Sequence, residues 1–126
     1  MIKQAISSSE AAQPVGPYSA AVRAGELLFI SGQVPIDPAS GKMVEGDIDV
    51  QTRRVLDNIG LLLRAAGLSY SHVIRTTVFL ADMNDFKAMN ETYGTFFVEP
   101  YPARSTVQAA RLPRDARIEI DAIAMF

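Results

Sequence analysis

The chain has 126 residues, a net charge of −2 and no cysteine. This length predicts one domain, residues 1–126, that can bury about two-thirds of its unfolded surface. The composition excludes disulfides, cysteine-based zinc sites and a thiol nucleophile, and the single histidine, His72, argues against a histidine-based metal site or a Ser-His-Asp triad.

The N-terminus and the overall charge bear on location and partners. The first ten residues, MIKQAISSSE, lack the apolar core of a signal peptide, and no stretch approaches the roughly 18 apolar residues of a membrane span. We therefore expect a cytoplasmic protein with no membrane segment. We expect no nucleic-acid partner, because counterion release requires a concentrated basic patch. We interpret the local cluster of Arg104, Arg111, Arg114 and Arg117 as a solvated turn.

The first half of the chain predicts two strands, a helix and a third strand. Two apolar runs around residues 24–26 predict a hairpin from about Tyr18 to Gly32. Apolar residues recur at helical spacing from about Ile48 to Ala66, and Gly67 follows as a helix cap. The stretch HVIRTTVFLAD, residues 72–82, is apolar on both alternating faces, which predicts a central strand.

The second half predicts one more helix and two more strands. Residues 83–98, MNDFKAMNETYGTFFV, have helical periodicity. Two strands follow, from about Ala103 to Ala109 and from Arg117 to Met125, with the turn LPRDA between them. The predicted buried stripe of this helix comprises Phe86, Met89, Tyr93, Phe96 and Phe97.

This order of elements predicts an α+β fold in which two helices pack on one face of a mixed sheet. The other face of the sheet is also apolar in the central strand. Nothing within one chain remains to cover it, so we infer a homo-oligomer. The two alternating sets of the central strand are Val73, Thr77 and Phe79 against Ile74, Val78 and Leu80.

Polar side chains stand at several predicted apolar positions. Glu119 shares a strand face with Asp121, and it either forms a structural salt bridge or serves as a functional carboxylate. Arg104 faces the same side as Thr106, and its guanidinium can offer two parallel donors to Glu119 or to a ligand. Asn90 falls inside the apolar arc of the second helix, where its amide needs partners from the backbone or elsewhere.

Taken together, the motifs of the chain resemble the RidA family, also called the YjgF/YER057c/UK114 family. The similar segments are GPYS at 16–19, FISGQVPIDPASG at 29–41, FLADMNDFKAMNETYGTFF at 79–97 and PARSTVQAARLPRDARIEID at 102–121. They occur in the family's order and span most of the chain. Taken alone, GPYS and SGQ fit ordinary turn chemistry.

The resemblance implies a chorismate-mutase-like α+β fold and a homotrimer with its sites between subunits. It also implies hydrolytic deamination of reactive 2-imino or enamine acids, such as 2-iminobutanoate and 2-iminopropanoate, to 2-oxo acids and ammonia. No cofactor or metal is expected. Small 2-imino and 2-oxo carboxylic acids are therefore the expected partners.

The resemblance also implies roles for individual residues. Arg104 would grip the substrate carboxylate, and Glu119 would hold or activate the attacking water. Many family members have cysteine where this chain has Thr106; threonine serves if that position acts through its backbone, whereas a role for the thiol would change the activity or the substrate range. The residues expected to line the cleft beside these are Tyr18, Ser31, Gly32 and Asn90.

Two other functions compete with imine hydrolysis. The first is a non-catalytic regulatory module that binds a small carboxylate in the same anion pocket. The second is an endoribonuclease acting on single-stranded RNA as a translation inhibitor. The acidic net charge and the lack of interleaved aromatic and basic residues argue against the nuclease.

Overall fold

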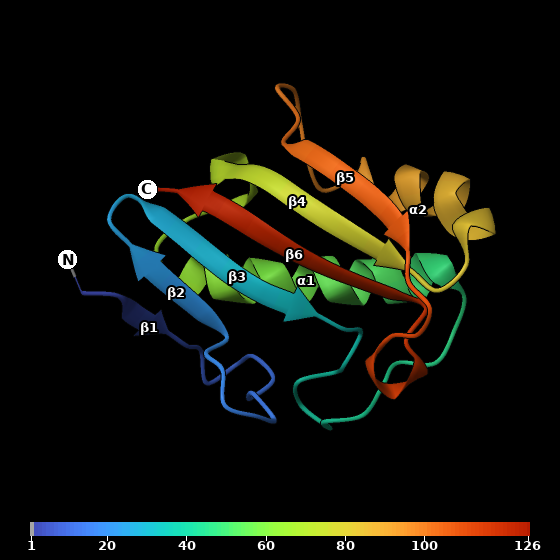
Figure 1. Cartoon of the computed structure of the whole chain (residues 1–126), viewed down its shortest axis with the longest axis horizontal. Helices are drawn as coiled ribbons and strands as arrows, with labels where there is room; N and C mark the ends of the chain where they lie inside the picture. The colour runs from blue at the N-terminus through green and yellow to red at the C-terminus, as the bar shows by residue number, and fades with distance from the viewer. Residues whose placement is uncertain (1) are drawn as a thin grey trace.

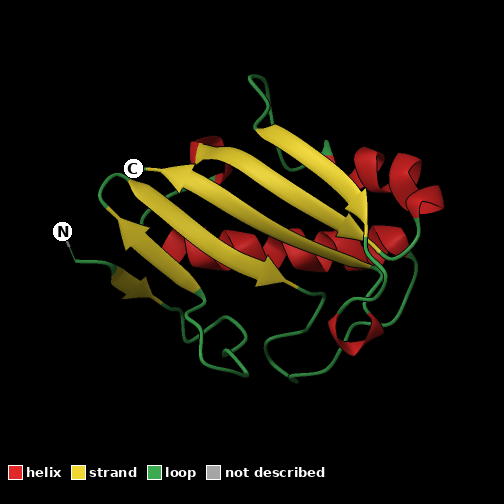
Figure 2. Ribbon diagram, viewed as in Figure 1, coloured by secondary structure: helices red, strands yellow, loops and turns green. Residues whose placement is uncertain are grey.

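The structure, a computed structural model, describes residues 2–126. A six-stranded sheet in the order β1-β2-β3-β6-β4-β5 forms one layer, and two α-helices lie behind it (Figures 1 and 2). The strands are β1 (Gln4–Ile6), β2 (Ala21–Ala24), β3 (Leu27–Gln33), β4 (Val73–Leu80), β5 (Ala103–Gln108) and β6 (Ile118–Met125). The helices are α1 (Ile48–Ala65) and α2 (Phe86–Tyr93), with 3₁₀ turns at Tyr70–His72, Met83–Asp85 and Pro113–Asp115.

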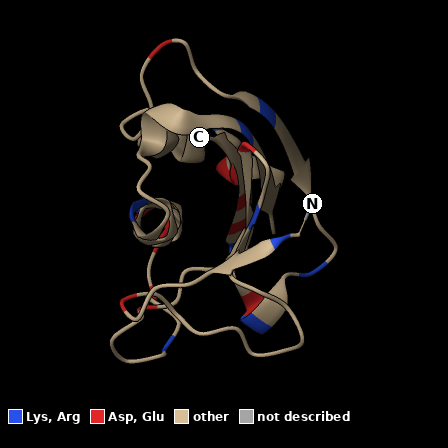
Figure 3. Ribbon diagram, turned by 90° about the vertical axis from the view of Figure 1, so that its left-hand side faces the viewer, with Lys and Arg blue, Asp and Glu red and all other residues tan. Residues whose placement is uncertain are grey.

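The sheet is mixed, as predicted. β4 and β5 are parallel, and the other neighbouring strands are antiparallel. Figure 3 shows α1 end-on to one side of the sheet. The side chains of Ile118 and Ile120 on β6 are fully buried, as are Val55, Ile59 and other apolar residues of α1, because the two elements pack against each other.

The boundaries of α1 follow from local chemistry. The Asp47 carboxylate accepts a hydrogen bond from the backbone N–H of Val50 at 3.1 Å, which caps the first turn. At the other end Gly67 has a φ of 79°, a left-handed conformation that ends the helix and that glycine adopts readily. The predicted helix is confirmed, and its last residue is Ala65.

The second helix is shorter than its apolar pattern predicts. Residues 83–85 form a separate 3₁₀ turn, because Asp82 accepts a hydrogen bond from the backbone N–H of Asn84 at 2.9 Å. After Tyr93 the chain leaves α2 through i to i+3 hydrogen bonds. Met89, Tyr93 and Phe97 are buried as predicted, but Phe86 is 38% exposed, so its place in the buried stripe is wrong.

The face of the sheet opposite the helices carries apolar side chains without a cover. Phe29, Val107 and Met125 are 41%, 44% and 47% exposed, respectively. The predicted second apolar face is therefore present within one chain, while the homotrimer that would cover it remains a prediction. Within residues 2–126, none of the helices combines the length and the apolar composition needed to cross a bilayer.

Candidate functional site

A cleft of about 800 Å³ opens at one end of the sheet. Its walls come from the loop before β2, the end of β3, the loop after β3, the 3₁₀ turn at Pro113–Asp115 and the start of β6. Four of the predicted site residues lie on these walls, although they are far apart in the sequence. They are Tyr18, Ser31, Gly32 and Glu119.

The Glu119 carboxylate lies directly against the backbone of Gly32. A Cβ built on Gly32 would overlap Glu119 Oε2 and lie 2.9 Å from Glu119 Cδ. The pairing of β3 with β6 shifts register between Ile30 and Gln33, so the chain is irregular where the carboxylate approaches. A glycine at this position therefore makes room for the carboxylate at the wall of the cleft.

Glu119 has no hydrogen-bond or ion-pair partner among residues 2–126. Burial raises the pKa of this carboxyl above its usual range, and the nearby Asp121 carboxylate raises it further. A carboxylate with a raised pKa is a stronger base when it is ionised. The alternative of a structural salt bridge within one chain is thus wrong for Glu119.

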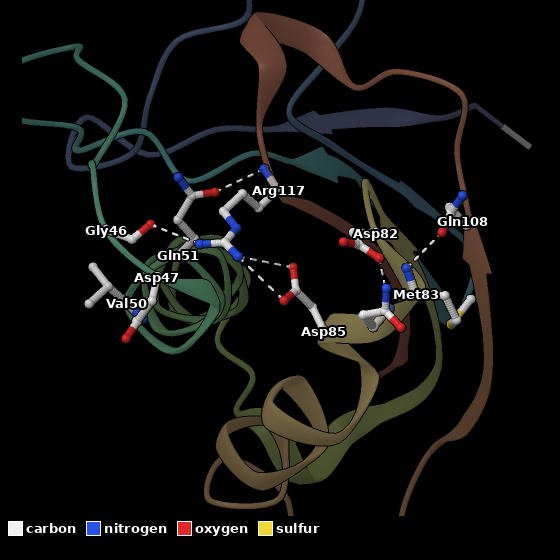
Figure 4. Close-up of polar contacts among 10 residues, drawn as sticks. Gly46, Asp47, Val50, Gln51, Asp82, Met83, Asp85, Gln108 and Arg117 are labelled. Carbon is white, nitrogen blue, oxygen red and sulfur yellow. Dashed lines mark hydrogen bonds and ion pairs between the residues drawn. The ribbon is translucent and has the colours of Figure 1, made fainter.

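The start of β6, which carries Glu119, is fixed by Arg117 (Figure 4). The backbone N–H of Arg117 donates to Gln51 Oε1 of α1 at 2.9 Å. Its guanidinium donates to both carboxylate oxygens of Asp85 at 3.3 Å and to the backbone oxygen of Gly46 at 3.4 Å. These contacts hold the strand two residues before Glu119 and join it to α1 and to the turn before α2.

Hydrogen bonds also hold the remaining walls of the cleft. Ser31 Oγ donates to the backbone oxygen of Ser19 at 2.7 Å, which ties β3 to the segment that contains Tyr18. On the loop after β3, the Asn58 amide of α1 donates to the backbone oxygen of Ile36 at 2.9 Å. Tyr18 itself is half exposed at the cleft.

The other three predicted site residues lie elsewhere, on β5 and α2. The Arg104 guanidinium packs over two aromatic rings. Its Cζ lies 4.8 Å from the centroid of the Tyr93 ring and 5.6 Å from the centroid of the Phe86 ring. The Tyr93 hydroxyl is hydrogen-bonded to Thr76 Oγ1 at 2.8 Å, so this platform is itself fixed. No carboxylate within residues 2–126 pairs with Arg104. One Nη1–H donates to Met89 Sδ at 4.0 Å, and the other N–H donors remain available to a ligand.

Two buried acceptors accompany Arg104 on these elements. Asn90 Oδ1 and Thr106 Oγ1 are buried without a hydrogen-bond partner among the described residues. Leaving such a group unsatisfied costs about 1–3 kcal/mol, which favours a ligand or water as the missing partner. The interpretation of Asn90 as an amide satisfied by the backbone is therefore wrong for its oxygen.

The suggested pairing of Arg104 with Glu119 does not form within one chain. Arg104 lies beside Thr76, whose side chain points to α2, so the guanidinium is on the helix side of the sheet. Glu119 lies beside Phe79 and alternates with the buried Ile118, so it is on the opposite side. The two charges thus serve different surfaces of the same chain.

The described residues also bear on metal binding and on histidine. Within residues 2–126, no group of three or more His, Cys, Asp or Glu side chains is arranged to hold a metal ion. His72 lies in a 3₁₀ turn, where its Nδ1 accepts a hydrogen bond from the backbone N–H of Ser69 at 3.1 Å. It takes no part in the cleft.

Comparisons with known proteins bear on the family of this chain. The family model described as Endoribonuclease L-PSP matches residues 8–126. The 2-iminobutanoate/2-iminopropanoate deaminase of Mus musculus is 46% identical over 125 residues, covering 99% of this chain and 93% of that protein. This chain belongs to the RidA family. A RutC family protein of Pyrococcus horikoshii is 54% identical to this RidA family protein over 123 residues, covering 98% of each.

A solved structure of the family shows the same architecture with a small molecule. The Escherichia coli TdcF structure with bound serine has a TM-score of 0.92 and 43% identity to this RidA family protein, covering 98% of both chains. The predicted α+β architecture, a mixed sheet with two helices on one face, is therefore confirmed.

The sequence patterns do not predict two features of the site. Tyr93 was predicted only as a core residue, whereas its ring also supports the Arg104 guanidinium. Arg114 was assigned to a solvated turn, whereas it lines the cleft with Glu119. Helical spacing predicts that Tyr93 lies one turn from Met89. No pattern in the sequence indicates that β5, which carries Arg104, lies beside these two residues.

Proposed function

We propose that this RidA family protein hydrolyses reactive 2-imino or enamine acids, such as 2-iminobutanoate and 2-iminopropanoate, to 2-oxo acids and ammonia. The observation that carries the proposal is the Glu119 carboxylate, which lies against Gly32 on the wall of the cleft without a hydrogen-bond or ion-pair partner among residues 2–126. Burial raises the pKa of this carboxyl. The name of the 46% identical mouse relative, a 2-iminobutanoate/2-iminopropanoate deaminase, supports it.

The proposed reaction adds one water to the C=N bond. Glu119 accepts a proton from the water as its oxygen bonds to the imine carbon, and the C=N bond becomes the C–N bond of a carbinolamine. The nitrogen then takes up a proton and leaves as ammonia, while the hydroxyl loses its proton and becomes the 2-oxo group. A protonated imine is already electrophilic, so positioning of the water can supply much of the rate acceleration.

Arg104 is proposed to bind the carboxylate of the imino acid. Its planar guanidinium offers parallel donors that match the two oxygens of a carboxylate. The aromatic rings of Tyr93 and Phe86 restrict the guanidinium without occupying those donors. The unpartnered oxygens of Asn90 and Thr106 would accept hydrogen bonds from the imine nitrogen or the water.

We further propose that the site is completed between subunits of a homotrimer. Because Arg104 and Glu119 lie on opposite sides of one sheet, a single chain cannot bring both to one substrate. Arg104 of one subunit, with its Asn90 and Thr106, would face the Glu119 cleft of its neighbour. The uncovered apolar face of the sheet supplies a surface for this association.

A non-catalytic module that binds a small carboxylate is the second candidate function. Arg104 and the unpartnered Asn90 and Thr106 oxygens favour it, because they suit anion binding and lie apart from Glu119 within the chain. Turnover distinguishes the two functions. A binding module would take up 2-oxobutanoate without accelerating the loss of the imine.

The deciding experiment lets threonine dehydratase generate 2-iminobutanoate and times 2-oxobutanoate release with and without this protein. Acceleration by the wild type, lost by about 100-fold or more in Glu119→Gln, is expected if Glu119 serves the water. Arg64→Ala is the matched control, because Arg64 is exposed in the last turn of α1 and does not line the cleft. Binding of 2-oxobutanoate without any acceleration would favour the binding module.

A further inference from the structure

The arginines near the end of the chain have different surroundings. Arg111 pairs with Asp115 and Arg117 pairs with Asp85. Arg114 has no carboxylate partner within residues 2–126; its one hydrogen bond runs to the backbone oxygen of Gly41 at 3.3 Å. Of these three arginines, Arg114 is therefore the one whose charge no carboxylate within residues 2–126 neutralises.

Arg114 lies on the wall of the same cleft as Glu119. Among the described residues that line this cleft, these two carry a charge, and they do not pair with each other. A guanidinium has five N–H donors, so one bond to Gly41 leaves most of them free. The cleft thus presents a base and a separate cationic donor.

The backbone of the turn holds Arg114 in this position. Arg114 and Asp115 have φ angles of 56° and 55°, in the left-handed region that residues with a side chain disfavour. Arg111 fixes the turn through bonds of 2.8 and 3.2 Å to the two carboxylate oxygens of Asp115. This fork also occupies the carboxylate nearest to Arg114 in sequence. Figure 2 shows the short helical turn of residues 113–115 beside the loop that follows β3, to which Gly41 belongs.

Within a single chain, the cleft is larger than a four-carbon substrate needs. Its volume of about 800 Å³ falls within the range of pockets that enclose much larger, drug-sized ligands, about 300–1,000 Å³. If Glu119 serves the reacting carbon and Arg104 holds the first carboxylate, Arg114 is left to contact the side chain of the substrate.

We propose that Arg114 recognises an anionic group at the far end of the substrate, so that the site prefers imines of acidic amino acids to alkyl imines with the same carbon chain. This inference rests on the proposed deaminase function for its substrate class. The Arg114 guanidinium would donate to a second carboxylate, which an alkyl chain lacks. Arg114 is thus a specificity-determining residue and takes no part in the addition of water.

Stable 2-oxo acids test the inference without turnover. Calorimetry would compare 2-oxoglutarate with 2-oxopentanoate, which has the same five-carbon chain and no second carboxylate. We expect the wild type to bind the diacid about 5- to 10-fold more tightly, the size of one partly exposed charge-assisted contact. Arg114→Asn should abolish that preference and leave 2-oxopentanoate binding within about twofold, because asparagine tolerates left-handed backbone and keeps the turn. Arg64→Ala removes the same charge from α1 and should change neither affinity.

Turnover of the corresponding imines, 2-iminoglutarate and 2-iminopentanoate, should show the same preference and the same loss. Equal affinities for the two acids in the wild type, or a preference that Arg114→Asn leaves intact, would overturn the inference. An equal loss for both acids would overturn it too, because Arg114 would then hold the carboxylate that both acids share.

These outcomes separate the inference from the proposed function. If the protein hydrolyses 2-iminobutanoate but its preference for the diacid does not depend on Arg114, the inference alone is refuted. A preference that depends on Arg114 in a protein that hydrolyses no imine refutes the deaminase and leaves the Arg114 subsite standing. If the wild type binds neither acid and turns over the two five-carbon imines equally, the inference is refuted, while release of 2-oxobutanoate from 2-iminobutanoate still decides the deaminase.

Discussion

Replacing Gly32 by alanine tests whether the position of the Glu119 carboxylate, as well as its charge, determines the rate. A Cβ at residue 32 would overlap Glu119 Oε2 and would lie 2.9 Å from Cδ and 3.2 Å from Cγ. These atoms end a flexible side chain, so the carboxylate can turn away while the backbone stays in place. The carboxylate would then leave the wall of the cleft.

The size of the two effects should differ. A side chain forced about 30° from its preferred rotamer costs about 0.5–1.5 kcal/mol, which lowers the melting temperature of a domain of this size by about 2–6 °C. A displacement of about 1 Å at a reacting group can lower the rate by about 100-fold. We therefore expect Gly32→Ala to fold normally and to lose about 100-fold in kcat.

The assay times 2-oxobutanoate release from enzymatically generated 2-iminobutanoate, with melting curves recorded on the same samples. Gly16→Ala is the matched control, because a Cβ there would meet the Tyr18 ring at an ordinary 3.5 Å. If Gly32→Ala acts through the carboxylate, its loss should not add to that of Glu119→Gln in the double variant. Wild-type kcat in folded Gly32→Ala, or losses that add in full, would refute the reasoning.

Three further predictions concern Arg104, Glu119 and assembly. Arg104→Lys keeps the charge and loses the forked geometry, so we expect at least about a tenfold fall in kcat/KM. The melting temperature should stay within a few degrees of wild type, because a cation–π contact contributes only about 0.5–1 kcal/mol. A loss of about 3–5 kcal/mol of unfolding free energy would instead indicate a buried ion pair. Because the fold raises the pKa of Glu119, ionisation of this carboxyl destabilises the folded state. The penalty is absent below the ordinary glutamate pKa, grows as the pH rises from that value to the raised one, and is complete above it. Glu119→Gln should therefore melt above wild type at neutral pH, with the difference closing on acidification; a difference that widens in acid would contradict the assigned shift. Light scattering should give about 41 kDa, three times the 13.7 kDa chain, and a monomer at micromolar concentration would refute the shared site.

Sequence periodicity predicted the elements that are long and well capped. α1 has 18 residues, a capping Asp47 and a terminal Gly67, so its apolar spacing is clear. β1 has only three residues and is held by pairing with β2, which no local pattern in the sequence indicates. Alternation within β6 correctly placed Glu119 and the buried Ile118 on opposite faces.

The relation between Glu119 and Arg104 could not be predicted in the same way. It depends on the register of β6 with β4 and of β4 with β5, and on a register shift between Val73 and Arg75. These are long-range pairings that one strand's alternation does not encode. The place of Arg114 in the cleft likewise depends on a turn meeting the loop after β3, far away in the sequence.

The separation of Arg104 and Glu119 onto opposite sides of one sheet has a genetic consequence. In the proposed homotrimer, a chain that lacks Arg104 still carries an intact Glu119 cleft, and a chain that lacks Glu119 still carries an intact Arg104. When two alleles of this kind are expressed together, their chains would assemble into mixed trimers. In some of these trimers, the intact Arg104 of one subunit would face the intact Glu119 of its neighbour. Each allele alone would be inactive, and the heterozygous cell would recover part of the activity by complementation between subunits.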